Sequence, residues 1–207
     1  MFLDRDGTVT QPRHYPSRPD DLVLQADIGP ALHSLQKAGF VLVLVTNQSG
    51  VARGFFTEHT VHTMHERLGA MLADHNVRLN GIYFCPHHVE GSVAQFRRLC
   101  QCRKPAPGML YQAAQDLRLD LARSWMVGDS PCDIAAGHSA GTRTALVGTS
   151  SDSLPPPDIC SASVAKTLLA VLRTSGREGS PPGGDDGGQG VVDEDSGGGI
   201  GGCWSRA

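Results

Sequence analysis

The segment Phe2-Leu3-Asp4-Arg5-Asp6-Gly7-Thr8 decides the expected fold and chemistry of this chain. Asp4 and Asp6 follow a short apolar stretch and are two residues apart, so in extended geometry both carboxylates would point to the same side. Paired carboxylates attract a divalent cation, and oxygen ligands of this kind favour Mg²⁺. With the cation present, Asp4 could attack a phosphate ester while Asp6 protonates the leaving oxygen.

The acidic pair by itself leaves alternatives open. An Asp-x-Asp-Gly stretch also occurs in solvated turns and in calcium-binding loops. A calcium loop is disfavoured because no glutamate stands at its twelfth position.

Outward from this segment, apolar runs alternate with helical patterns. The expected strands are 1–3, 40–45, 81–84, 124–127 and 144–147. The expected helices are 30–39, 57–76, 107–119, 130–140 and 163–173. Strands alternating with helices indicate a three-layer, Rossmann-like α/β fold, in which helices cover both faces of a parallel sheet. Such sheets bind ligands at the carboxyl ends of their strands.

Polar residues that suit a phosphate site stand at or near those expected strand ends. Thr46 leads into Asn47-Gln48-Ser49-Gly50, a run of small donors, and Lys104 could neutralise phosphate charge. Asp129 follows another strand, with Asp133 one helical turn later. Each has a simpler explanation as a turn former, a solvated lysine or an acid at a helix start. Their order along the chain favours one common site.

Two close pairs of soft ligands predict a metal site of the Cys₃His type. The ligands are Cys85, His87, Cys100 and Cys102. Four protein ligands leave no open position, which favours a structural zinc ion. Free thiols beside a surface histidine are the alternative, and His88 is a competing imidazole. This loop leads directly into Arg103 and Lys104, so zinc would help to position them.

In the order Asp4-Arg5-Asp6-Gly7-Thr8, Thr46, Lys104 and Gly128-Asp129-Ser130-Pro131-Cys132-Asp133, these motifs resemble those of the haloacid dehalogenase superfamily. The resemblance implies that Asp4 is the nucleophile and Asp6 the general acid and base. It also implies that Thr46 and Lys104 stabilise the phosphoryl group. Mg²⁺ would be held by Asp4, Asp129 and the backbone carbonyl of Asp6. No large cap domain is expected.

Residues 1–173 resemble, more narrowly, the D-glycero-D-manno-heptose 1,7-bisphosphate 7-phosphatase family. The resemblance rests on the first acidic segment, Thr-Asn-Gln-Ser-Gly-Val-Ala-Arg-Gly, Cys-Pro-His-His and Cys-Arg-Lys-Pro-Ala-Pro-Gly-Met-Leu. It implies release of the C7 phosphate of a small phosphorylated sugar, and the same zinc loop. The implied substrate contacts are Pro12, Arg13, His14, Tyr15, Thr46, Asn47, Gln48, Ser49 and Arg103, with Arg53 as a further basic candidate.

Alternatives to this activity come from two classes of protein. Histidinol-phosphate phosphatases and other small sugar-phosphate phosphatases share the acidic motif, and the histidinol-phosphate enzymes also share the zinc loop. A non-catalytic, zinc-stabilised binding module is the third alternative.

Two departures from the family pattern also matter. The chain begins almost on its first strand, which predicts a stability lower by about a few kcal/mol. Ser130 stands where some relatives have a basic residue.

Bulk composition limits the partners. The 207 residues carry a formal net charge of -3, so no general attraction to nucleic acid or acidic membranes is expected. No secretory signal or membrane-spanning stretch is visible, and we expect a cytoplasmic monomer. Residues 1–173 would form the phosphatase domain. Residues 174–207, rich in Gly, Asp and Ser, would form a disordered tail.

Overall fold

The computed structural model describes residues 1–148, 155–177 and 205–206. The strands are β1 (Phe2–Leu3), β2 (Val43–Asn47), β3 (Gly81–Cys85), β4 (Trp125–Gly128), β5 (Arg143–Val147), β6 (Ile159–Ser161) and β7 (Ser205–Arg206). The helices are α1 (Ile28–Lys37), α2 (Glu58–Ala73), α3 (Gly108–Leu117), α4 (Pro131–Ser139) and α5 (Val164–Arg177). One 3₁₀ turn, Pro19–Asp21, lies between β1 and α1. The expected α/β fold is confirmed.

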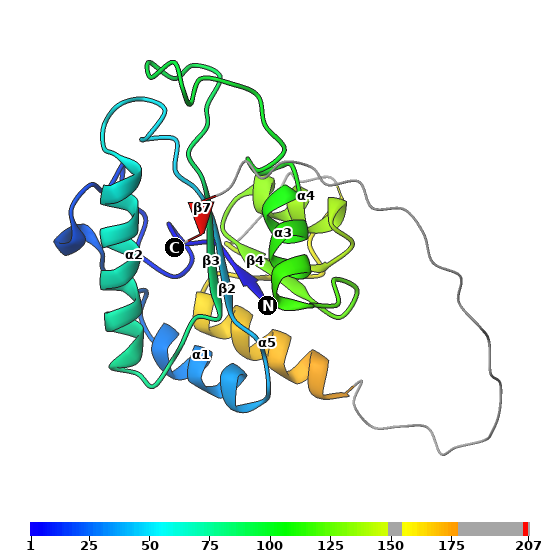
Figure 1. Cartoon of the computed structure of the whole chain (residues 1–207). Coiled ribbons are helices and arrows are strands. Elements are labelled where there is room, and N and C mark those ends of the chain that lie inside the picture. The colour runs from blue at the N-terminus through cyan, green and yellow to red at the C-terminus, as the bar shows by residue number, and fades with distance from the viewer. Residues whose placement is uncertain (149–154, 178–204, 207) are drawn as a thin grey trace.

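The strands form one sheet in the order β6-β5-β4-β1-β2-β3-β7. All neighbouring pairs are parallel except β3 and β7, which are antiparallel. The short strand β1 lies between β2 and β4, with Phe2 opposite both Val43 and Met126 (Figure 1). The strand order therefore reverses at β1, and in open α/β sheets ligands bind at such a point.

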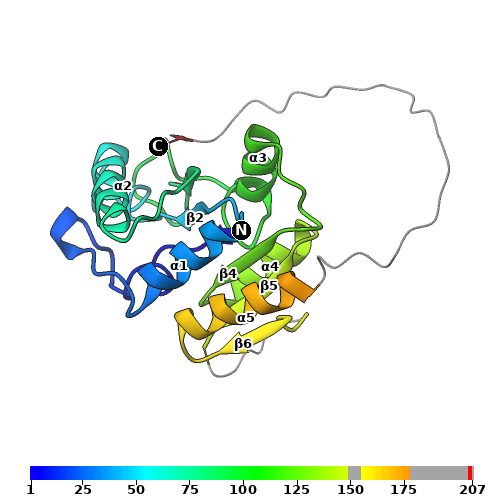
Figure 2. The same cartoon turned by 90° about the horizontal axis from the view of Figure 1, so that it is seen from below.

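Helices cover both faces of this sheet because alternate strand residues point in opposite directions. Phe2, Val43 and Val45 pack in one apolar cluster with residues of α3 and α4. Leu3 and Leu44 pack in a second cluster with residues of α1, α2 and α5. Figure 2 shows α3 and α4 separated from α1 and α2 by the central strands. All five side chains are fully buried, and each stabilises the fold by roughly 1.5–3 kcal/mol.

Several expected element boundaries shift in the structure. β2 begins at Val43 and continues to Asn47, whereas the apolar run alone placed a strand at 40–45. α2 begins after Thr57 as expected, and the Thr57 hydroxyl accepts a hydrogen bond from the Thr60 amide at 3.2 Å. β6 was not expected, because its three residues follow a proline-rich stretch and show no apolar run.

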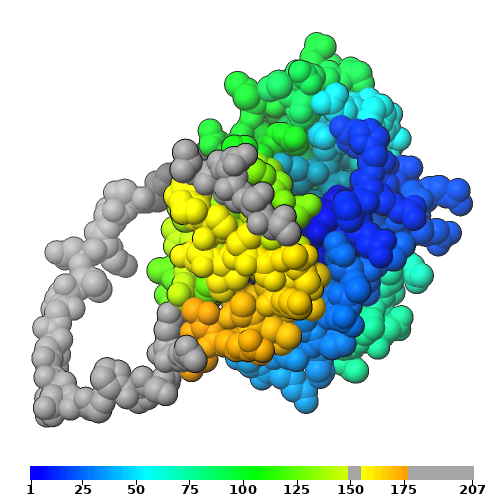
Figure 3. All heavy atoms as spheres, turned by 180° about the vertical axis from the view of Figure 1, so that it is seen from behind, coloured from blue at the N-terminus to red at the C-terminus, as the bar shows by residue number. Residues whose placement is uncertain are grey.

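The carboxyl-terminal part of the described chain adds to the main domain. α5 continues to Arg177, so the expected domain boundary at residue 173 falls inside this helix. Figure 3 shows α5 and β6, in orange and yellow, together at the back of the molecule beside the blue N-terminal segment. The tail for which disorder was expected lies mostly outside the described residues. Within the described residues, no helix combines the length and apolarity needed to cross a bilayer.

Candidate active site

Three carboxylates meet at the carboxyl ends of the two central strands. Asp4 follows β1, Asp129 follows β4, and Asp133 lies in the first turn of α4. One oxygen of each lies within 4.8 Å of the others. Gly7 makes this approach possible, since a Cβ atom there would lie 1.9 Å from Asp129 Oδ2. Gly7 also has φ +87°, a conformation that favours glycine.

Lys104, in the segment between β3 and α3, joins the carboxylates. Its buried ammonium lies 2.5 Å from Asp4 Oδ1, 2.6 Å from Asp133 Oδ1 and 2.8 Å from the Val45 carbonyl oxygen. Burial alone would lower the pKa of Lys104, but the Asp133 and Asp4 charges raise it above its usual value. Lys104 therefore stays cationic between two acids.

Lys104 alone does not neutralise the carboxylates, and the pKa values of Asp4 and Asp129 are raised. Burial raises the pKa of Asp4 to about 7, against the lowering effect of Lys104. Although Asp129 is solvent-exposed, desolvation and the Asp133 charge raise its pKa to about 6. A divalent cation at these oxygens would relieve the repulsion, and a cluster of carboxylate oxygens is the donor set that Mg²⁺ prefers. The residues present fit such an ion.

Asp6 is oriented by a set of donors of its own. Arg5 donates from Nε to Oδ1 at 3.1 Å and from Nη2 to Oδ2 at 2.8 Å. Gln48 donates to Oδ2 at 3.0 Å, and Thr10 to Oδ1 at 3.4 Å. β1 ends at Leu3, so the strand geometry assumed for both acids does not extend to Asp6. The Asp6 side chain is thus held apart from the cluster of Asp4, Asp129 and Asp133.

Asn47, the last residue of β2, binds the Lys104 backbone through two hydrogen bonds. Asn47 Nδ2 donates to the Lys104 carbonyl oxygen at 3.0 Å, and the Lys104 amide donates to Asn47 Oδ1 at 3.1 Å. Thr46 is buried, and its hydroxyl accepts a hydrogen bond from Gln48 Nε2 at 2.9 Å. Asn47 therefore acts on the Lys104 backbone, while Gln48 links Thr46 to Asp6.

A pocket of about 210 Å³ opens beside Asp6. Its lining residues are Asp6, Arg13, His14, Tyr15, Pro16, Asn47, Gln48, Ser49 and Gly50. Most of the expected substrate contacts are therefore together at one pocket. Pro12, Thr46, Arg53 and Arg103 are not among its lining residues.

The two expected basic contacts, Arg53 and Arg103, have partners outside this pocket. Arg53 Nη2 lies 3.3 Å from Glu90 Oε2, and Arg103 Nη1 donates to the His87 carbonyl oxygen at 3.4 Å.

The four expected zinc ligands also come together. The Sγ atoms of Cys85, Cys100 and Cys102 lie 3.1–3.5 Å apart, and His87 Nδ1 is 3.3 Å from Cys102 Sγ. A disulfide requires about 2.05 Å, so these are separate thiols. A hydrogen bond from Cys102 lowers the pKa of Cys85 to about 6. The same hydrogen bond raises the pKa of Cys102, and burial raises that of Cys100, so Cys85 is the thiol that ionises first. His88 is outside this cluster, and its Nδ1 accepts from the Glu90 amide.

The loop carrying these thiols is tied to the substrate pocket. The Gln48 amide donates to the Cys85 carbonyl oxygen at 2.8 Å, and the Ala52 amide to the Pro86 carbonyl oxygen at 3.2 Å. Figure 1 shows this loop, in green, extending beyond the carboxyl ends of the strands next to the loop that follows β2. A fixed cysteine cluster would therefore hold both loops.

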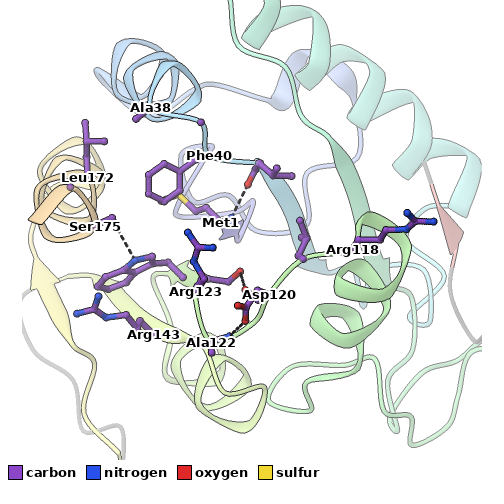
Figure 4. A pocket seen from close by; sticks show the side chains of 16 residues that line it. Met1, Ala38, Phe40, Arg118, Asp120, Ala122, Arg123, Arg143, Leu172 and Ser175 are labelled. Atoms are coloured by element: carbon purple, nitrogen blue, oxygen red, sulfur yellow. Dashed lines mark hydrogen bonds between the residues drawn. The ribbon is translucent and has the colours of Figure 1, made fainter. Parts of the chain in front are cut away.

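A second cavity, of about 610 Å³, lies at the opposite end of the sheet (Figure 4). Met1, Phe40 and Trp125 line it, and each lies at or before the start of a strand. Burial lowers the pKa of the Met1 amine to about 5, and this amine donates to the Val41 carbonyl oxygen at 2.7 Å. None of the acids described above lines this cavity, so it is separate from the carboxylate site.

Two residues have roles in the structure that their sequence positions do not predict, Asp133 in the carboxylate cluster and Arg5 beside Asp6. Asp133 caps the start of α4, as its position in the sequence suggests, but its Oδ1 also lies 2.6 Å from Lys104 Nζ. Its spacing from Asp129 on an expected helix was the available signal. Arg5 carried no such signal, because a lone arginine between two acids is normally solvated, and here it is fully buried.

A HAD-hydrolase-like family model matches residues 101–170. D-Glycero-beta-D-manno-heptose-1,7-bisphosphate 7-phosphatase of Yersinia pestis is 48% identical over 147 residues, covering 71% of this chain and 78% of that protein. The protein of the same name from Escherichia coli (strain K12) is 47% identical, covering 71% and 77%.

A solved structure is also similar. The D,D-heptose 1,7-bisphosphate phosphatase from B. bronchiseptica, complexed with magnesium and phosphate, matches with a TM-score of 0.73 at 32% identity. The match covers 84% of this chain and 98% of that chain. The chain described here is therefore a phosphatase and belongs to the D-glycero-beta-D-manno-heptose-1,7-bisphosphate 7-phosphatase family.

Proposed function

We propose that this chain is a Mg²⁺-dependent phosphatase that removes the C7 phosphate of D-glycero-D-manno-heptose 1,7-bisphosphate. The names of its relatives support the substrate. The observation that carries the mechanism is the convergence of Asp4, Lys104 and Asp129 at the point where the strand order reverses. This arrangement combines a nucleophile, a phosphate-neutralising cation and a metal ligand.

The reaction proceeds in two transfers. An Asp4 carboxylate oxygen attacks phosphorus, the bond from phosphorus to the sugar oxygen breaks, and protonated Asp6 gives its proton to that oxygen. Water then attacks the aspartyl-phosphate, and Asp6 takes the proton of this water. Asp4 is regenerated and inorganic phosphate leaves. In this proposal, Lys104 and Thr46 stabilise the phosphoryl oxygens.

The metal-binding residues would be Asp4, Asp129 and the backbone carbonyl of Asp6. When bound, Mg²⁺ supplies the positive charge that allows a phosphate dianion to approach the Asp4 carboxylate. Asp133 then acts mainly by holding Lys104, which it contacts at 2.6 Å. In the same proposal the Cys₃His cluster holds a structural zinc ion. Zinc would stabilise the loop before Lys104 without touching the substrate.

The test is phosphate release from both anomers of heptose 1,7-bisphosphate, with and without Mg²⁺, and with histidinol phosphate alongside. Asp4→Asn should abolish release while leaving the circular dichroism spectrum unchanged. Asp74→Asn, an exposed acid at the end of α2, is the matched control and should retain full activity. Wild-type activity in Asp4→Asn would refute the nucleophile. Preferential hydrolysis of histidinol phosphate would assign the rival substrate.

Two further expectations stay predictions. We propose a monomer, which size-exclusion chromatography with light scattering would test, and a cytoplasmic location, which cell fractionation would test.

A further inference from the structure

Arg5 lies fully buried between the proposed acid Asp6 and a histidine of α2. Two of its nitrogens donate to the two Asp6 oxygens, at 3.1 and 2.8 Å. The third, Nη1, lies 3.4 Å from His65 Nε2. His65 is itself only 2% exposed. Arg5 and His65 therefore form a buried pair behind Asp6, whose side chain is 28% exposed and lines the substrate pocket.

The chemistry of the pair settles which atom of His65 accepts. A guanidinium has only donors, so a hydrogen bond between the two requires His65 Nε2 to accept. The ring proton is then on Nδ1, which is buried and has no hydrogen-bond partner among the described residues. Burial lowers the pKa of His65 to about 3, and the Arg5 charge acts in the same direction, so the ring is neutral. The ring packs edge-on against Phe84, with centroids 5.8 Å apart. His65 is thus a fixed, neutral acceptor.

We propose that His65 is a positioning residue for the phosphatase reaction, acting through Arg5 to orient the Asp6 carboxyl toward the leaving oxygen. This inference rests on the proposed function, in which Asp6 is the general acid and base. Without an acceptor at position 65, Nη1 of the buried Arg5 would seek another partner. The planar fork that aligns both Asp6 oxygens would then turn with it.

Two substrates with different leaving groups can distinguish a His65 that positions Asp6 from a His65 that only stabilises the fold. A sugar alkoxide leaves poorly and needs the Asp6 proton, whereas p-nitrophenolate leaves readily without one. General acid catalysis contributes about 10²–10⁴-fold to a rate. Misplacing the acid should therefore slow transfer from a sugar phosphate far more than transfer from p-nitrophenyl phosphate. A loosened fold would slow both alike.

The experiment compares His65→Leu, which lacks the acceptor, with His65→Gln, whose side-chain carbonyl can replace it. The first turnover is followed for both substrates, because it reports formation of the phosphoenzyme. His65→Leu should lose roughly 10-fold or more in the saturating first-turnover rate with the sugar phosphate and about twofold or less with the aryl phosphate, at an unchanged half-saturating substrate concentration. His65→Gln should restore most of the loss.

His62→Leu is the matched control. His62 stands on the same helix and also meets the Phe84 ring edge-on, at 5.4 Å, but no hydrogen bond joins it to Arg5. It should match wild type on both substrates. If His65→Leu does not fold, His65→Ala makes the same comparison, since it also lacks the acceptor.

Asp6→Asn separates the two levels of the proposal. If Asp6→Asn affects the sugar phosphate selectively and His65→Leu affects both substrates equally, the positioning role is overturned while the acid role stands. If Asp6→Asn itself slows both substrates equally, the acid role fails and the positioning role fails with it. Failure of His65→Gln to recover activity would also overturn the inference.

Discussion

Replacing Lys104 with methionine removes the cation that lies between two buried acids. The ammonium is 2.5 Å from Asp4 and 2.6 Å from Asp133, and the lysine side chain is only 2% exposed. Removing one partner of a buried ion pair leaves the other charge uncompensated, which typically lowers the free energy of unfolding by about 3–5 kcal/mol. We expect a loss of this size at pH 8 in a chelating buffer.

The loss should depend on pH with a definite sign. Burial raises the pKa of Asp4 in the folded protein to about 7, well above the usual value of an aspartate. A carboxyl with a raised pKa favours folding below its unfolded pKa, and this contribution is lost as the pH rises through the folded pKa. In the folded protein the Lys104 charge lowers the pKa of Asp4, so Lys104→Met should raise that pKa further. Above pH 7 the variant should keep losing about 1.4 kcal/mol per pH unit relative to wild type, until Asp4 ionises.

Urea unfolding at pH 5 and pH 8 measures this directly. Lys166→Met, at an exposed lysine of α5, is the control and should stay within about 0.5 kcal/mol of wild type at both pH values. A loss below about 1 kcal/mol at pH 8, or an equal loss at the two pH values, would refute the reasoning.

Three further predictions concern the metal sites. Gly7→Ala should weaken Mg²⁺ binding, measured by calorimetry, by at least about tenfold and should lower stability. The new Cβ would lie 1.9 Å from Asp129 Oδ2, and the backbone there has φ +87°. Unchanged Mg²⁺ affinity would contradict this packing argument. In chelator, the melting temperature should fall as the pH rises from 5 to 8, since the pKa values of Asp4 and Asp129 are raised to about 7 and 6. Adding Mg²⁺ should raise the melting temperature more at pH 8 than at pH 5. An equal rise in melting temperature at the two pH values would count against the site. Cys100→Ser should lower both the zinc content by elemental analysis and the melting temperature, whereas the exposed Cys160→Ser should change neither; full zinc occupancy in Cys100→Ser would disprove this ligand set.

Local sequence patterns predicted much of the fold because they report what each segment buries. The apolar runs before Thr46 and Asp129 marked strands that are buried on both faces. Thr57 marked the start of α2 through its capping hydroxyl. β6 gave no such pattern, since it depends on pairing with β5 rather than on its own composition.

Among the site residues, the sequence alone singled out Asp4, Lys104, Asp129 and the Cys₃His cluster. Their residue types suit phosphate or metal chemistry, and parallel strands bring their carboxyl ends to one edge of the sheet. The sequence could not rank Arg53 against Asn47 as participants in the site. The structure pairs Arg53 with Glu90 and uses Asn47 to hold the Lys104 backbone.

The sequence by itself determined the chemistry available to this protein, because the acidic segment, the lysine and the soft ligands are properties of the residues themselves. Only the tertiary structure decided how those groups are paired. Asn47 meets Lys104 across 57 residues, and Arg5 meets His65 across 60. Contacts of this kind leave no periodic trace, since they arise when separate strands and helices pack and buried polar groups must find partners.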